Sequence, residues 1–212
     1  MLASTDMYAT VSLVVAILAL LISGLTAWLT LLKRATVKMT QPTVIYFGPD
    51  GDGARDRSSL KVYLRTLLYA TAKRGCIVES MFVRLRRGET AQNFNVWVYG
   101  DERLIRGSGL FVPEAGLTTN HHFLLPSDGT TFTFLPGAYT VELLASVVGE
   151  KSARTLKSIR LAVSTEQSAE LLEPKRGIYF DWSPDTDQYH AHVRADTWSD
   201  QREFERHFGI GK

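Results

Sequence analysis

Two patterns of hydrophobic residues divide the chain, and the first is an unbroken apolar run near the N-terminus. Residues 7–32 contain no Asp, Glu, Lys or Arg. As an α-helix, residues 10–32 would span roughly 34 Å, against about 30 Å for the hydrocarbon core of a bilayer. A helix satisfies every backbone N–H and C=O inside lipid without help from another segment. The run therefore predicts a transmembrane helix over residues 10–32, preceded by a short tail over residues 1–9.

Beyond this run, hydrophobic and polar residues alternate with a period of two. The alternating segments are, in chain order, 43–47, 60–70, 77–86, 94–98, 108–112, 120–125, 130–135, 139–147 and 159–163. Such alternation is typical of strands with one buried face, and turn signals rich in Gly, Pro and Asp separate the segments. The pattern predicts an all-β domain over residues 43–173, an antiparallel β-sandwich of about eight strands. A basic juxtamembrane linker over residues 33–42 precedes it.

One segment of the predicted sandwich resembles a known structural motif. Residues 135–141, Leu-Pro-Gly-Ala-Tyr-Thr-Val, resemble the tyrosine corner that opens strand F of immunoglobulin-like sandwiches. Tyr139 would be the corner residue, and its hydroxyl is expected to make an internal hydrogen bond. The resemblance implies an immunoglobulin-like fold and no particular activity, because sandwiches host many functions. Val141 stands where antibody domains have a cysteine, which argues against a domain of the antibody type.

The C-terminal stretch 174–212 is aromatic and acidic rather than alternating. It is predicted to be a tail with a possible short helix over residues 197–208. The tail could fold back and complete the sandwich core, or it could present its aromatic side chains to a partner. For residues 177–192 folding back is expected, because exposed large aromatic side chains reduce solubility.

Small residues form a stripe along the predicted transmembrane helix. They recur every three or four positions, and they are Ser12, Ala16, Ala19, Ser23, Thr26 and Thr30. Small side chains let helices approach closely in lipid, where packing and interhelical hydrogen bonds drive association. The stripe predicts a contact with a second copy of the chain or with a partner helix. The alternative is a chance arrangement of residues that are common in membrane spans.

Charge predicts how the helix is oriented. Lys33, Arg34 and Lys38 follow the apolar run, whereas no Lys or Arg precedes it. The positive-inside rule therefore predicts a single-pass membrane protein with its C-terminal domain in the cytoplasm. The single cysteine, Cys76, also suits a reducing compartment. A signal peptide is the open alternative, although its apolar core would cover only roughly 7–15 residues.

The net charge of +2 is unevenly distributed along the chain. Residues 33–90 hold 12 Lys and Arg against 5 Asp and Glu, whereas residues 91–212 hold 12 against 16. Arg84 and Arg86 would point the same way from a strand. The sequence predicts that five cations contact anionic lipid headgroups, and they are Lys33, Arg34, Lys38, Arg84 and Arg86. For Arg84 and Arg86, the alternative is a solvated strand face. Nucleic-acid binding is not expected, because it needs a larger basic excess and a recognisable motif.

Acidic residues and histidines provide weak candidates for a metal site. Asp181, Asp185 and Asp187 could ligate Ca²⁺, but the turn signal between them explains two of the three equally well. His190 and His192 would share one face of a strand, whereas a zinc site needs three or four ligands. We expect no metal or other cofactor. No catalytic motif is recognisable either, so a non-enzymatic protein is expected.

These patterns together predict a membrane-anchored interaction, scaffolding or sensing module that presents a β-sandwich at the cytoplasmic face of the membrane. Its expected partners are the lipid bilayer and a protein or second copy bound through the helix. One alternative is a sandwich that responds to calcium or lipid. Another is an accessory subunit of a membrane enzyme or transport complex.

Overall fold

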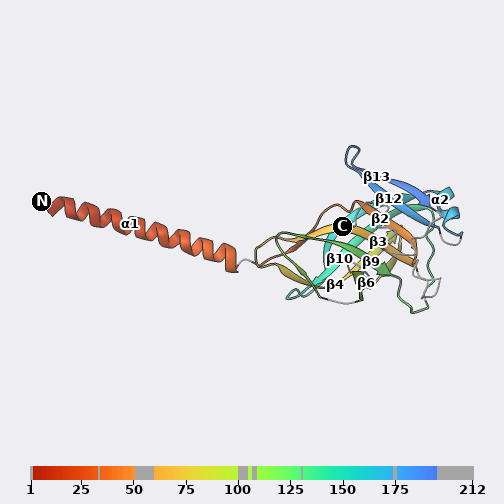
Figure 1. Ribbon diagram of the computed structural model, residues 1–212, viewed down its shortest axis with the longest axis horizontal. Helices are drawn as coiled ribbons and strands as arrows, with labels where there is room; N and C mark the ends of the chain where they lie inside the picture. The colour runs from red at the N-terminus through yellow and green to blue at the C-terminus, as the bar shows by residue number, and fades with distance from the viewer. Residues whose placement is uncertain are drawn as a thin grey trace.

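The computed structural model describes residues 2–32, 34–50, 60–99, 105–106, 109–129, 131–173 and 176–194. The chain begins with helix α1 (Leu2–Ala27), which continues into a π-helical turn, η1 (Trp28–Leu32). Among the described residues, Thr10–Thr30 is a helix long and apolar enough to cross a membrane, and none of it is buried. It projects away from the rest of the molecule (Figure 1). The expected apolar helix is thus confirmed, whereas its insertion into a membrane stays a prediction.

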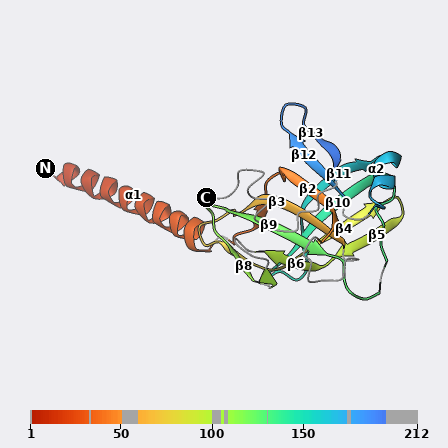
Figure 2. The same ribbon diagram turned by 45° about the vertical axis from the view of Figure 1, so that its right-hand side comes forward.

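The rest of the described chain forms two antiparallel sheets (Figures 1 and 2). The larger sheet has the order β13-β12-β2-β3-β9-β6-β7, and β1 pairs with β3. Its strands are β1 (Val37–Met39), β2 (Val44–Pro49), β3 (Leu60–Ala70), β6 (Val96–Tyr99), β7 (Ile105–Arg106), β9 (Leu117–Leu124), β12 (Gly177–Ser183) and β13 (Gln188–Arg194). The smaller sheet has the order β11-β10-β4-β5, and β8 pairs with β4. Its strands are β4 (Cys76–Arg87), β5 (Thr90–Phe94), β8 (Leu110–Val112), β10 (Gly137–Val147) and β11 (Arg154–Val163).

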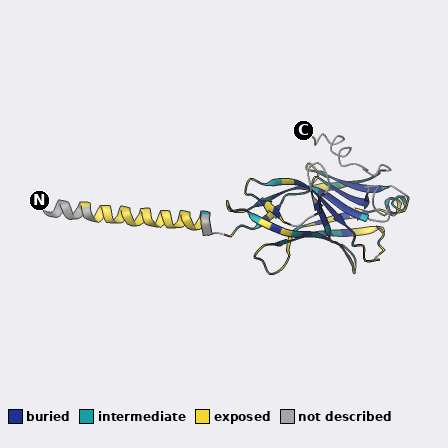
Figure 3. Ribbon diagram, turned by 60° about the horizontal axis from the view of Figure 1, so that its bottom comes forward, coloured by how far each residue is buried: buried dark blue, intermediate teal, exposed yellow. Residues whose placement is uncertain are grey.

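The hydrophobic core lies between the two sheets (Figure 3). It forms because alternate residues of the long strands point inward, as Val141, Leu143 and Ala145 do from β10. Aromatic side chains fill its centre, where the rings of Phe47 and Phe134 stack with centroids 5.1 Å apart. The all-β architecture predicted from the alternation is therefore confirmed.

The structure corrects the expected number of strands. It has thirteen strands in the described residues, against about eight predicted. Strands of two or three residues, such as β1 and β7, carry too little alternation to be recognised. Conversely, the candidate strand at 130–135 is irregular over its described residues, 131–135, although Phe132 and Phe134 pack in the core. Those residues alternate because every second side chain reaches the core, without pairing to a neighbouring strand.

The structure also corrects both boundaries of the sandwich. The predicted linker 33–42 contains β1, and the larger sheet continues past residue 173 into β12 and β13. Residues 177–180 of β12 are all buried, because this strand lies inside the sheet with both faces covered. Such a strand is a continuous apolar run rather than an alternating one. The possible helix at 197–208 lies outside the described residues.

Tyr139 occupies the corner position expected from the motif. Its side chain is buried at the start of β10, and its hydroxyl donates a hydrogen bond to the Leu135 carbonyl at 2.6 Å. The ring meets Phe47 edge to face, with centroids 6.2 Å apart. This bond fixes the bend by which the chain enters β10.

Replacing Tyr139 with Phe removes the hydroxyl and keeps the ring. Because the Leu135 carbonyl then loses its donor, we expect the free energy of unfolding to fall by about 0.5–1.5 kcal/mol. The measurement is chemical denaturation of the full chain in mild detergent, followed by near-UV circular dichroism. Tyr69→Phe on β3 is the matched control, because it makes the same change at a strand tyrosine that is only partly buried. Equal stability of the wild type and Tyr139→Phe would contradict this role of the corner.

Candidate functional site

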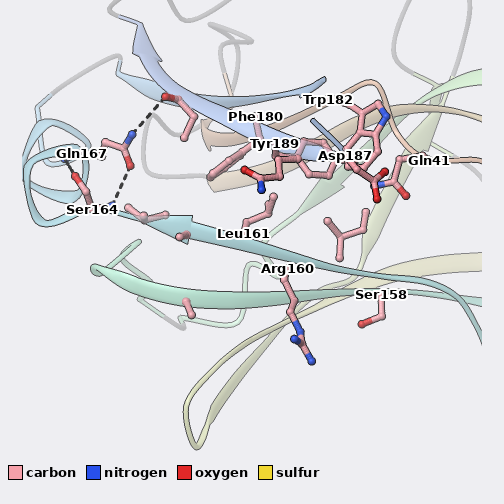
Figure 4. A pocket seen from close by; sticks show the side chains of 16 residues that line it. Gln41, Ser158, Arg160, Leu161, Ser164, Gln167, Phe180, Trp182, Asp187 and Tyr189 are labelled. Carbon is pink, nitrogen blue, oxygen red and sulfur yellow. Dashed lines mark hydrogen bonds between the residues drawn. The ribbon is translucent and has the colours of Figure 1, made fainter. Parts of the chain in front are cut away.

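A groove of about 790 Å³ lies between an edge strand of the smaller sheet, β11, and an edge strand of the larger sheet, β13 (Figure 4). β11 ends the smaller sheet and β13 ends the larger one, and among the described residues each of them pairs with a strand on one side only. An edge strand presents unpaired backbone N–H and C=O groups along its free side. The groove therefore offers backbone hydrogen-bonding groups beside a hollow.

The floor and one wall of the groove are apolar. Leu161 of β11 and Phe180 of β12 are buried at its base. Trp182 and Tyr189 form the wall, with their rings edge to face and centroids 5.0 Å apart. Phe180, Trp182 and Tyr189 lie in the stretch where the sequence concentrates aromatic side chains, yet the sequence alone did not identify the groove.

The Tyr189 side chain is held by hydrogen bonds at its hydroxyl. The hydroxyl donates to the Pro42 carbonyl at 2.7 Å and accepts from Gln41 Nε2 at 2.9 Å. Burial raises the pKa of Tyr189 well above its ordinary value, so the phenol stays neutral at physiological pH. The aromatic wall is therefore fixed in place before any ligand arrives.

A short helix, α2 (Thr165–Glu170), stands at the end of the groove that follows β11. Ser164 and Gln167 form a capping box at its N-terminus, in which each side chain bonds to the backbone N–H of the other residue. The Gln167 Nε2 also donates to the Ala191 carbonyl of β13 at 3.5 Å. This contact joins the segment after β11 to β13 at one end of the groove.

A row of aromatic side chains crosses the opposite, outer face of the larger sheet. One residue from each of five adjacent strands stands in this register: His192, Tyr179, Tyr46, Tyr63 and His122. The Tyr46 ring lies over Gly48 and Gly177, where a Cβ atom on either glycine would collide with it. The sequence gives no sign of this row, because it exists only through the register of five separate segments.

A buried histidine lies within the core of the larger sheet. His121 accepts a hydrogen bond at Nδ1 from Trp97 Nε1 at 3.0 Å, and its Nε2 lies 2.7 Å from Thr119 Oγ1. Because Nδ1 accepts, the proton of the neutral ring is on Nε2 and is donated to the threonine. Complete burial lowers the pKa of His121 to about 3. The neighbouring His122 has its pKa lowered by burial and by the charge of Lys61.

The structure separates the cations that were predicted to face lipid. Arg34 and Lys38 are exposed next to the end of the helix, and Lys33 lies outside the described residues. Arg84 and Arg86 are toward the far end of β4, where β5 pairs with them, whereas β8 and the start of β4 lie near α1 (Figure 2). Eight residues of strand correspond to about 26 Å. The direction of β4 thus carries its arginines away from the helix, and contact of the five cations with lipid stays a prediction.

Arg84 and Arg86 instead belong to the outer face of the smaller sheet. Arg86 Nε lies 3.1 Å from a carboxylate oxygen of Glu142, and Arg84 Nη1 lies 3.8 Å from it. The Arg84 guanidinium also lies over the Phe82 ring. Arg160 of the edge strand β11 lies in the same row as Arg86, with Thr140 between them.

The three aspartates proposed for calcium do not converge. Asp181 lies on β12 with its carboxylate 3.4 Å from His192 Nδ1, and Asp185 accepts a hydrogen bond from the Ser183 hydroxyl in the following turn. Asp187 ends that turn in the left-handed region, with φ of 55°. In the described part of the chain, no three His, Cys, Asp or Glu residues are gathered so that they could hold a metal ion.

The small-residue stripe lies exposed along the helix. Ser12, Ala16, Ala19, Ser23 and Thr26 are exposed on α1, and Thr30 is half-buried in η1. The Thr26 and Thr30 hydroxyls donate to the carbonyls four residues earlier, each at 2.8 Å. These two hydroxyls therefore need no partner helix to satisfy them in lipid, and close packing is what the stripe still offers. Association through the stripe stays a prediction.

No protein-family model, no curated protein and no solved structure matches this chain. The groove, the two outer sheet faces and the apolar helix are thus the features from which its role is to be inferred. Of these, the groove combines a hollow, fixed aromatic side chains and unpaired backbone edges in one place.

The buried histidines predict that acid destabilises the fold. Their pKa values lie below the ordinary value of about 6.5, so the unfolded chain binds protons that the folded chain does not. Stability is therefore fully present well above pH 6.5. As the pH falls below 6.5, the free energy of unfolding decreases, with a limiting slope of about 1.4 kcal/mol per pH unit for His121 and a further decrease from His122. The measurement is denaturant unfolding of the full chain at several pH values.

His121→Gln should flatten this pH dependence by the contribution of one histidine. The matched control is Trp97→Phe, which removes the hydrogen bond to His121 but keeps the histidine. It should lower stability at every pH and leave the slope unchanged. The same slope for His121→Gln and the wild type would show that His121 does not carry the effect.

Proposed function

We propose that this protein is a non-enzymatic, membrane-anchored interaction module that captures an extended segment of a partner protein in the groove between β11 and β13. The observation that carries the proposal is the edge of β11, which no strand of the described residues covers, beside a preformed apolar hollow. An extended peptide that adds to an edge strand gains main-chain hydrogen bonds from the edge and specificity from the pockets beside it. The groove provides both elements.

The side chains of β11 indicate which partner sequence would fit. Ile159, Leu161 and Val163 point inward and are buried, whereas Arg160 points away from the groove onto the outer face of the smaller sheet (Figure 4). A strand added to β11 would place every second side chain over the apolar floor. Its remaining side chains would lie on the outer face, in the row of Arg160 and Arg86. The partner segment is therefore expected to alternate apolar and acidic residues.

A short peptide in which valine alternates with glutamate is the probe for this groove. We expect it to bind the full-length protein in mild detergent and to change the fluorescence of Trp182, which lines the groove. The same peptide with its backbone nitrogens methylated should bind at least tenfold more weakly, because each methyl group removes a donor needed by the edge strand. Binding is measured by fluorescence anisotropy of a labelled peptide.

Arg160→Glu tests the charge part of the proposal. This variant should weaken binding of the glutamate peptide and improve binding of a matched peptide in which lysine replaces glutamate. Arg154→Glu is the control, because Arg154 already pairs with Glu150 through two nitrogen atoms. Equal affinity for the methylated and unmethylated peptides would rule out strand addition.

We further propose that α1 and η1 anchor the module in a membrane with the sandwich on the cytoplasmic side. The apolar length of Thr10–Thr30 supports a span, and the cations that follow it support this orientation. A reporter that is active only in the cytoplasm should therefore be active when fused after Lys212. Changing Lys33, Arg34 and Lys38 to Gln should weaken that orientation. An active export-dependent reporter on the wild-type fusion would reverse the assignment.

We infer an immunoglobulin-like topology for the sandwich. The order β2-β3-β9-β6 corresponds to strands A-B-E-D, and β11-β10-β4-β5 corresponds to G-F-C-C′ of the variable type. The Tyr139 corner at the start of β10, the equivalent of strand F, supports the same assignment. In this scheme β12 and β13 extend the larger sheet beyond strand A, and the groove lies between that extension and strand G.

A further inference from the structure

Three large hydrophobic side chains are exposed together at one end of the sandwich. Ile77, Phe111 and Val148 are 46%, 56% and 59% exposed. Ile77 and Phe111 are cross-strand partners on β4 and β8, and the Val148 backbone N–H donates to the Ile77 carbonyl at 3.0 Å. Three segments of the chain thus bring these residues into one patch, which we call the end patch.

The Phe111 side chain is supported in its exposed position. Its ring lies against Gly75, where a Cβ atom would come within 2.6 Å of the ring. Gly75 has a φ of +69°, a conformation that favours glycine. Both the turn and the position of the Phe111 ring therefore depend on Gly75. The ring is therefore packed against the turn rather than loosely placed.

The end patch lies at the end of the sandwich from which the apolar helix emerges. Thr36, which follows the helix, accepts a backbone hydrogen bond from Thr71 at 3.0 Å, and Thr71 begins the turn that contains Gly75. Figure 2 shows β8 close to the end of α1 and β5 at the far end of the domain. Four residues lie between Leu32 and Val37, and the five Cα–Cα steps from one to the other span at most about 17 Å. This tether thus keeps the end patch close to the C-terminal end of the helix.

Cations surround the end patch. Lys73 and Arg74 are exposed in the turn before β4, and Lys151 is exposed in the turn after Val148. Arg34 and Lys38 add two more exposed cations beside the helix. Among the described residues, three carboxylates lie at the same end of the sandwich, and they are Glu79, Glu114 and Glu150. One of them, Glu150, is paired with Arg154 at 2.8 Å. In the part of the chain that the structure describes, positive charge therefore exceeds negative charge around the apolar side chains.

We propose that the end patch docks the sandwich onto the surface of an anionic bilayer, with Ile77, Phe111 and Val148 entering the headgroup region and Lys73, Arg74 and Lys151 contacting lipid phosphates. This inference rests on the proposed membrane anchor. Apolar side chains ringed by cations match the interface between headgroups and acyl chains, whose charge is negative where anionic lipids are present. The short tether favours the bilayer over a second copy or a soluble protein, because it keeps the patch beside the membrane at all times.

Docking would fix the orientation of the whole domain. Because β4 runs from the end patch toward Arg84 and Arg86, a docked sandwich stands with its long strands directed away from the membrane. The groove beside β11 is then presented sideways, clear of the lipid. An undocked domain would instead be held near the membrane by the tether alone.

The test uses the full chain with Cys76 replaced by Ser and a single new cysteine labelled with an environment-sensitive fluorophore. The test position is Val148→Cys, the matched control at the far end is Glu89→Cys, and Ile22→Cys reports on the helix. Each protein is reconstituted into vesicles of phosphatidylcholine alone or of phosphatidylcholine with phosphatidylglycerol. We expect the Val148 label to shift to the blue and brighten in the anionic vesicles, while the Glu89 label keeps its aqueous spectrum in both.

The cations are tested by Lys73→Gln, Arg74→Gln and Lys151→Gln in the Val148→Cys protein. Each change should lower the ratio of docked to undocked protein by about fivefold, the factor that corresponds to about 1 kcal/mol per cation at an anionic surface. Hydrogen exchange of the wild-type protein provides a second measurement that needs no label and no cysteine substitution. Exchange should be slower at residues 109–116 and 148–153 in anionic vesicles than in neutral ones.

The outcomes separate the two proposals. A Val148 label that stays in water, together with an Ile22 label in lipid and unchanged hydrogen exchange, would overturn docking and leave the anchor standing. An Ile22 label in water would overturn the anchor and the docking surface with it. A Val148 label that responds equally in neutral and anionic vesicles would overturn the role assigned to the cations.

Discussion

The difference in width between the two sheets is the constraint on which the rest of the structure depends. The larger sheet has eight strands and the smaller has five, so they cannot cover each other completely. Where they overlap, residues such as Phe47, Val83 and Leu143 are excluded from water. Beyond the overlap, β12 and β13 continue past β11, and the space left between them is the groove. The candidate site is thus a consequence of how the sandwich closes.

The groove keeps its shape because polar contacts hold its borders. Tyr189 is fixed at its hydroxyl by Gln41 and Pro42, and Gln167 connects the end of β11 to β13. Each contact adds a modest amount of stability, roughly 0.5–1.5 kcal/mol. A preformed site of this kind loses little conformational entropy when a ligand binds, which favours recognition of an extended segment.

The two ends of the sandwich have different chemical character. The strands β3, β4 and β10 have 11 or 12 residues each, so the ends are about 35–40 Å apart. The end next to the apolar helix carries exposed Phe111 and Val148 among cations, whereas the other end carries arginines that pair with Glu142. If the helix anchors the protein as proposed, this polarity gives the domain one side toward the membrane and one side toward the aqueous phase.

The amino-acid sequence by itself determined the apolar helix, the long alternating strands and the Tyr139 corner. Each of these depends on residues close together in the chain, since alternation along β3 or β10 records which side of one strand is buried. Tertiary structure alone decided that β12 lies inside the larger sheet, that five aromatic residues share one register, and that Arg84 and Arg86 lie far from the helix. It also placed Ile77, Phe111 and Val148 side by side. Strand order and register join residues far apart in the sequence, and the alternation of any one strand is compatible with many neighbours.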